Sequence, residues 1–174
     1  LSRGLGDVYK RQFLDHARDA AQDAPPEAVP ALSFVRGIVA DAQRGGQAVK
    51  LGNLQGDLAG RATFRQDSLR RAVENLIGNA VRYGEHAEVE AALGPSYFRI
   101  SVEDDGPGIP PESRSEALKP FTRLDAARNQ NQGQEGVGLG LSIAADIARA
   151  HGGQLRLVEG ERLGGLRAEI VIPR

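Results

Sequence analysis

Residues 74–83 read Glu74-Asn75-Leu76-Ile77-Gly78-Asn79-Ala80-Val81-Arg82-Tyr83, and this stretch decides the fold. It closes the strongest helical pattern of the chain, Gln66 to Tyr83, which either Asp67 or Ser68 is suited to cap and which Gly84 follows. The apolar residues of this pattern fall on one stripe: Leu69, Val73, Leu76, Ile77 and Ala80. We therefore predict a long helix that packs its apolar stripe against a sheet.

Outward from this helix, helical and strand patterns alternate along the chain. Helical spacing extends over Phe13 to Gln22, Ala31 to Arg44 and Leu141 to His151. Strand patterns cover Gln47 to Leu54, Asp57 to Phe64, Ala87 to Leu93, Tyr97 to Glu103, Gln154 to Glu159 and Leu166 to Ile172. Two hairpins are expected among these strands, one of them through Gly94-Pro95-Ser96. Together, the helical and strand patterns predict an α/β fold, a two-layer α/β sandwich in which helices cover one face of a mixed sheet.

Composition limits what the chain can be. With 174 residues and a net charge of -1 it has the size of one domain and lacks the basic field of a general nucleic-acid binder. It contains no cysteine, and no apolar stretch approaches the roughly 20 residues of a membrane helix. It also contains no methionine, and we expect residues 1–12 to be a non-native or disordered leader. We expect residues 13–29 to be a helical remnant and linker, and residues 30–174 to be the main domain.

Asn75 and Asn79 lie four residues apart, so their side chains share one face of the predicted helix. Two amides beside an apolar stripe need partners. They either bridge or cap within the core, or they serve a ligand, since an amide oxygen is a suitable ligand for Mg²⁺.

Asp104-Asp105-Gly106-Pro107-Gly108 follows an apolar strand pattern. Asp-Gly is common in ordinary turns, so this pair alone proves nothing. Two glycines around a proline do indicate a backbone that approaches something closely. A carboxylate at the floor of a pocket can accept a hydrogen bond from the exocyclic amine of adenine, whereas guanine presents a carbonyl there.

Gly136, Gly138 and Gly140 alternate immediately before a helical pattern. The spacing differs from the dinucleotide fingerprint, and the chain has no P-loop string. The segment is either an ordinary flexible loop or a lid that brings backbone N–H groups and a helix N-terminus to phosphate. Arg82, Arg123 and Arg128 are candidates to meet phosphate or are solvated surface residues, and Tyr83 could stack on a base or pack the helix end.

Together and in this order, these strings resemble the catalytic ATP-binding domain of sensor histidine kinases, whose superfamily (GHKL) includes gyrase, Hsp90 and MutL-type ATPases. Residues 74–83 resemble the N box, residues 104–108 the G1 box, residues 119–125 the F box and residues 136–141 the G2 box. Within this family, the sequences of these motifs are most similar to those of osmosensor-type bacterial kinases. The resemblance covers about residue 30 to the end and implies the Bergerat type of α/β sandwich.

The resemblance implies a binding site for ATP and Mg²⁺. Asn75, Asn79, Arg82 and Arg123 are the implied catalytic residues, with Asn79 as metal ligand. The implied nucleotide-binding residues are Asn75, Asn79, Arg82, Tyr83, Asp104, Gly106, Gly108, Ile109, Phe121, Gly136, Val137, Gly138, Leu139, Gly140 and Leu141.

The same family comparison separates kinases from ATPases. The ATPases carry a glutamate one helical turn before the metal-binding asparagine, and here that position is Asn75, while Glu74 projects about a quarter-turn away. We therefore expect a histidine kinase, with a GHKL-type ATPase, an anti-sigma-type serine kinase and a degenerate ligand-sensing domain as alternatives.

The phosphoacceptor string of the family, His-Glu-x-x-Thr-Pro, is missing from the chain. The implied partners are therefore ATP or ADP, a histidine-containing dimerisation domain and a response regulator. We expect the fragment to be monomeric and cytoplasmic, without nucleic acid or membrane contact, and its parent to be a homodimer at the inner membrane.

Overall fold

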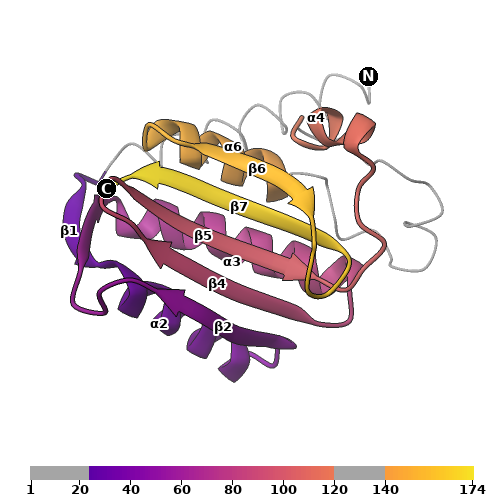
Figure 1. Ribbon diagram of the computed structural model, residues 1–174, viewed down its shortest axis with the longest axis horizontal. Coiled ribbons are helices and arrows are strands. Elements are labelled where there is room, and N and C mark those ends of the chain that lie inside the picture. The colour runs from indigo at the N-terminus through magenta and orange to yellow at the C-terminus, as the bar shows by residue number, and fades with distance from the viewer. Residues whose placement is uncertain (1–23, 120–139) are drawn as a thin grey trace, which may run out of the picture.

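The computed structural model describes residues 24–119 and 140–174 (Figure 1). In chain order the elements are β1 (Glu27–Pro30), α2 (Ala31–Arg44), β2 (Val49–Gln55), β3 (Arg61–Phe64), α3 (Gln66–Tyr83), β4 (Ala87–Leu93), β5 (Tyr97–Asp104), the 3-10 helix η1 (Pro111–Ser113), α4 (Arg114–Ala117), α6 (Gly140–Ala150), β6 (Gln154–Glu159) and β7 (Leu166–Pro173). None of the helices in the described ranges is long and apolar enough to cross a membrane.

The main sheet has five strands in the order β2-β4-β5-β7-β6. β2 runs parallel to β4, and the other neighbours are antiparallel, so the sheet is mixed. Figure 1 shows α2, α3 and α6 on the same side of this sheet, and none of the three covers its other face. The predicted two-layer sandwich is confirmed.

The core lies between this sheet and the three helices. All five apolar residues predicted for the stripe of α3 are buried, and the inward residues Phe98, Ile100 and Val102 of β5 are at most 2% exposed. Because strand side chains alternate between faces, the next inward position after Val102 is Asp104. The core column of β5 therefore ends in a carboxylate at the helix-covered face.

β1 was not predicted, and its first three residues fall in the stretch expected to be a linker. It pairs antiparallel with β3 in a separate two-stranded sheet. The predicted strand from Asp57 to Phe64 is shortened to Arg61–Phe64. Residues 57–60 instead form a turn in which the Asp57 carboxylate accepts the Ala59 N–H.

The predicted side-chain cap of α3 is wrong. Arg65 occupies the N-cap position, and neither Asp67 nor Ser68 makes a capping hydrogen bond. The Arg65 N–H is instead bonded at 3.1 Å to Nε2 of His151, at the end of α6. His151 also donates from Nδ1 to the Ile147 carbonyl oxygen at 2.8 Å. One imidazole thus joins the start of α3 to the end of α6, and it must be neutral to accept at Nε2.

Lowering the pH is expected to weaken this connection. Burial is the main reason why the pKa of His151 is lowered from 6.5, and the nearby charge of Arg65 acts in the same direction. The unfolded chain therefore binds more protons in this range, so the contribution is complete above pH 6.5 and is lost as the pH falls through the lowered folded pKa. Urea unfolding at several pH values between 7.5 and 5 checks this, and His151→Gln should flatten the curve relative to the native chain.

His86→Gln is the matched control, because His86 is exposed and lies outside the contact between α3 and α6. It should leave the loss of unfolding free energy below pH 6.5 in place. A native curve no steeper than that of His151→Gln would contradict the role given to His151.

Candidate nucleotide site

Three elements meet at one end of the molecule: the second half of α3, the end of β5 and the start of α6. A β-carbon on Gly140, the first residue of α6, would lie 3.6 Å from the Asn75 carbonyl oxygen. A β-carbon on Gly106, just after β5, would lie 2.7 Å from the Tyr83 carbonyl oxygen. Glycine at position 106 thus permits the G1 segment to touch the end of α3.

Asp104 is the buried carboxylate of this region, with 5% of its surface exposed. Its Oδ1 accepts the N–H of Gly106 at 2.9 Å and the N–H of Leu166 at 3.1 Å. Leu166 is the first residue of β7, 62 positions away in the chain. Two rigid backbone donors therefore hold the carboxylate in one orientation, while a carboxylate has capacity for about four hydrogen bonds.

Asp105 instead binds the residues that follow α3. Its Oδ1 accepts the N–H groups of Glu85 and His86, and its Oδ2 lies 2.8 Å from Nδ1 of His86. The hydrogen bonds from His86, backbone first and then side chain, lower the pKa of Asp105 to about 2. This carboxylate closes the connection between α3 and β4, which leaves Asp104 as the one that points toward the helix layer.

Asn75, Asn79 and Arg82 are half-buried on α3. Within residues 24–119 and 140–174, no hydrogen bond or ion pair occupies these three side chains. A bridging role for the two amides inside the core is therefore not what the described residues show. Amide oxygens that lie at the edge of the core and keep their acceptor capacity fit Mg²⁺, which takes one or two protein ligands besides water and phosphate.

The same part of the chain offers no alternative metal site. No group of three His, Cys, Asp or Glu side chains comes together there in a way that could hold an ion.

Glu74, the neighbour of Asn75, faces away from this region. Its side chain is 53% exposed, and its Oε1 lies 3.5 Å from Nη1 of Arg70 on the same helix. The quarter-turn expected between positions 74 and 75 therefore separates a solvated glutamate from the half-buried amide.

The other predicted residues are only partly covered by the structure. Ile109 and Leu141 are buried, and Tyr83 is half-buried at the end of α3. Gly108 has a φ of 72° and faces the Gly165 carbonyl. Seven candidate residues from the sequence lie outside the described residues: Phe121, Arg123, Arg128, Gly136, Val137, Gly138 and Leu139.

The sequence reasoning missed the contribution of the turn between β6 and β7. Gly165 donates its N–H to the Asp104 carbonyl at 3.0 Å, and a β-carbon on Gly165 would lie 2.2 Å from Asp104 Oδ1. Nothing in the sequence around Gly165 indicates that this turn touches Asp104, which lies 61 positions earlier.

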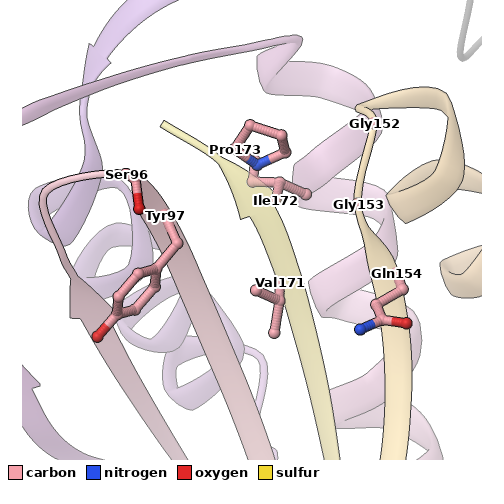
Figure 2. A pocket seen from close by; sticks show the side chains of 8 residues that line it. All are labelled: Ser96, Tyr97, Gly152, Gly153, Gln154, Val171, Ile172 and Pro173. Carbon is pink, nitrogen blue, oxygen red and sulfur yellow. The ribbon is translucent and has the colours of Figure 1, made fainter.

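A shallow depression of about 420 Å³ lies at the other end of the sheet (Figure 2). Its lining comes from the β4–β5 turn with the start of β5, the α6–β6 turn with the start of β6, and the end of β7. It consists of Ser96, Tyr97, Gly152, Gly153, Gln154, Val171, Ile172 and Pro173. It begins where β5 starts, roughly 20 Å from Asp104 at the rise of a strand. Because none of these lining side chains is charged, the depression is not suited to a triphosphate.

Comparison with known proteins identifies the family of the chain. The family model described as histidine kinase-, DNA gyrase B-, and HSP90-like ATPase matches residues 64–174. The sensor histidine kinase GtrS of Pseudomonas aeruginosa is 41% identical over 107 residues, which are 62% of this chain and 21% of GtrS. The sensor histidine kinase CpxA of Escherichia coli is 40% identical over 109 residues, 62% of this chain and 23% of CpxA. The chain thus spans about a fifth of the length of these relatives.

Solved structures agree with the fold. The histidine kinase domain of the Escherichia coli osmosensor EnvZ is 31% identical, with a TM-score of 0.63 over 87% of this chain and 91% of that chain. The ATP-binding domain of PrrB from Mycobacterium tuberculosis is 23% identical, with a TM-score of 0.66 over 86% of this chain and 98% of that chain.

Proposed function

Because this chain belongs to the family of histidine kinase-, DNA gyrase B- and HSP90-like ATPases, we propose that it binds Mg-ATP and transfers the γ-phosphoryl group to a histidine on a separate dimerisation domain. The curated relatives named above are sensor histidine kinases. The phosphorylated histidine would then pass its phosphoryl group to a response regulator, which is the role of two-component signalling.

The proposed function rests on the arrangement of one carboxylate and two amide side chains. The buried, oriented carboxylate of Asp104 ends the core column of β5, and the amides of Asn75 and Asn79 lie on the helix packed over that strand. This combination offers a hydrogen-bond acceptor for a base and amide ligands for a phosphate-bound cation.

Asp104 would accept a hydrogen bond from the adenine amine, and its two backbone donors keep it from turning away. Tyr83 and Ile109 would line the nucleotide pocket. Asn79 would hold Mg²⁺, with Asn75 and Arg82 beside it and the phosphates. When bound, Mg²⁺ neutralises charge on the phosphate oxygens.

In the transfer step, an imidazole nitrogen of the acceptor histidine forms a bond to the γ-phosphorus. The bond from that phosphorus to the β–γ bridging oxygen breaks, and ADP leaves. The contribution of this chain is to position the triphosphate and to place the positive charge of Arg82 nearby. Hydrolysis should be slow, because Asn75 cannot act as a base and Glu74 is turned toward Arg70 and solvent.

The proposal extends to the surroundings of the domain. The described residues contain neither a membrane-spanning helix nor a dimerising hairpin. We infer a cytoplasmic, monomeric catalytic piece whose parent is a homodimeric kinase at the inner membrane. Nucleic acid has no part in this function.

Asn79→Ala is expected to weaken the binding of ATP in the presence of Mg²⁺ by roughly tenfold or more, the loss that corresponds to one polar interaction with a charged group. Calorimetric titration of ATP, ADP and GTP, each with and without Mg²⁺, checks this. The dependence of ATP affinity on Mg²⁺ should be lost in the variant, because Asn79 is the proposed ligand.

The matched control is Asn53→Ala, an exposed asparagine on β2, which should bind like the native chain. Transfer of labelled phosphate from ATP to a supplied histidine domain of a related kinase then tests the reaction itself. A native chain that binds no adenine nucleotide at millimolar concentration would overturn the proposed function.

A further inference from the structure

The face of the sheet that the helices leave uncovered carries a connected group of six charged side chains and one serine. Its members are Glu88, Glu90, Ser101, Glu103, Arg162, Arg167 and Glu169. Arg162 pairs with Glu88 at 2.7 Å and with Glu90 at 2.9 Å, and Arg167 pairs with Glu169 at 2.9 Å. We refer to these seven residues as the outer charge network.

Glu103 is the most buried charged member of the outer charge network, with 3% of its surface exposed. Its Oε1 has no hydrogen bond within the described residues, and its ion pair with Arg167 is long, at 4.0 Å. A buried carboxylate oxygen without a hydrogen bond is costly. The network alone does not account for a glutamate at this position.

The contacts of the other oxygen explain why Glu103 is there. Its Oε2 accepts the backbone N–H of Leu163 at 2.7 Å and that of Arg162 at 3.2 Å. Both donors belong to the turn between β6 and β7, residues 160–165. A β-carbon on Gly160 would lie 2.9 Å from Cγ of Glu103, so the glutamate also packs against the first residue of that turn.

The same turn reaches Asp104 from the other side of the strand. The Gly160 N–H is bonded to the Gly165 carbonyl at 2.8 Å, which closes the turn. Gly165 then donates to the Asp104 carbonyl, and Leu166 donates to Asp104 Oδ1. Neighbouring residues of β5, pointing to opposite faces of the sheet, thus bind one turn, Glu103 at its middle and Asp104 at its end.

We propose that Glu103 is a positioning residue for adenine selection, because it holds the β6–β7 turn in the place from which the Leu166 N–H orients the Asp104 carboxylate and the Gly165 N–H binds the Asp104 carbonyl. This inference rests on the proposed function, since it assigns Glu103 an effect on the same site. It requires no contact between Glu103 and the nucleotide. It predicts that an acceptor oxygen at position 103, and not only the burial of the side chain, controls the preference for ATP over GTP.

The test compares Glu103→Met with Glu103→Gln. Both side chains have nearly the length of glutamate, but only glutamine keeps an oxygen that can accept from Arg162 and Leu163. Glu103→Met is expected to reduce the ratio of ATP to GTP affinity by roughly tenfold, on the scale of one hydrogen bond to a charged group. Glu103→Gln should stay within about threefold of the native ratio, since neutral hydrogen bonds retain part of that interaction.

Glu169→Met is the matched control. Glu169 belongs to the same network and pairs with Arg167, but in the described part of the chain it does not bind the backbone of the turn. Its ratio of ATP to GTP affinity should equal that of the native chain. A general loss of structure on this face would lower stability in both methionine variants and leave the two ratios alike.

Hydrogen exchange supplies a readout that needs no nucleotide. The amide of Leu166 should exchange faster in Glu103→Met than in Glu169→Met, because its bond to Asp104 depends on the position of the turn. In an Asp104→Asn background, Glu103→Met should cause no further loss of selectivity, because the two changes act on one interaction.

The outcomes separate the two claims. If Asp104→Asn loses the preference for ATP while Glu103→Met keeps the native ratio, the inference is overturned and the proposed function stands. If the native chain shows no preference that Asp104→Asn removes, the proposed function fails first. Should Glu103→Met not fold, Glu103→Asp, whose carboxylate is one methylene shorter, takes its place with the same expected direction.

Discussion

Asp104→Asn is expected to weaken ATP binding by roughly tenfold to a hundredfold, or about 1.5–3 kcal/mol, while GTP binding changes little. The asparagine oxygen can still accept the N–H groups of Gly106 and Leu166, so the local backbone should remain in place. The second group becomes an amide that donates, and it would then face the donating amine of adenine. Titration calorimetry with ATP, ADP and GTP measures the effect directly.

Asp105→Asn provides the matched control, because it makes the same chemical change one residue further along. Asp105 is tied to Glu85 and His86 and has no role in base recognition here. This variant should lose stability above pH 4, where the native Asp105, with its pKa of about 2, is charged and bonded. It should keep the native preference for ATP. Equal loss of preference in the two variants would contradict the assignment of Asp104.

Gly165→Ala is expected to abolish the oriented state of Asp104 and to destabilise the fold by about 1–3 kcal/mol, the usual cost of overpacking. The new β-carbon would lie 2.2 Å from Asp104 Oδ1, 2.4 Å from the Asp104 carbonyl oxygen and 2.7 Å from the Gly106 nitrogen. Two of these atoms are backbone, so the strand end or the turn must move. ATP affinity should fall at least as far as in Asp104→Asn, which calorimetry measures, and the loss of stability appears in urea unfolding.

Gly37→Ala is the matched control, because it makes the same substitution at a position with room for a β-carbon. Gly37 lies within α2, and a β-carbon there would meet no atom within 4 Å. This variant should gain up to about 1 kcal/mol of stability from helix propensity and should bind ATP like the native chain. If Gly165→Ala bound ATP with native affinity, the proposed coupling between the β6–β7 turn and Asp104 would be wrong.

Much of the architecture could be predicted from periodicity. The bounds of α2 and α3 agree with the sequence prediction, because both helices bury a clear stripe of aliphatic residues. The hairpin of β4 and β5 follows in the same way from alternation around a glycine and proline turn. β1 escaped prediction because four residues beside two prolines carry little pattern, and only the pairing with β3 makes them a strand.

The residues of the candidate site likewise fall into those that the sequence predicted and those that it did not. Asn75 and Asn79 could be selected from the sequence, because polar residues at the edge of an apolar stripe are conspicuous, and the family resemblance selected Asp104. The roles of Glu103, Gly165 and His151 could not, because each depends on a partner about 60 or more positions away. The predicted cap of α3 failed for this reason, since an imidazole from the end of α6 binds the Arg65 N–H.

The sequence by itself determined the class of fold, the helix that carries the two amides and the carboxylate at the end of β5. These are local properties, because they follow from the spacing of apolar residues and from the sequence motifs around them. Only the tertiary structure decided which turn holds the Asp104 carboxylate in place. The arrangement follows from the sheet, because the side chains of Glu103 and Asp104 point to opposite faces and the β6–β7 turn binds both of them.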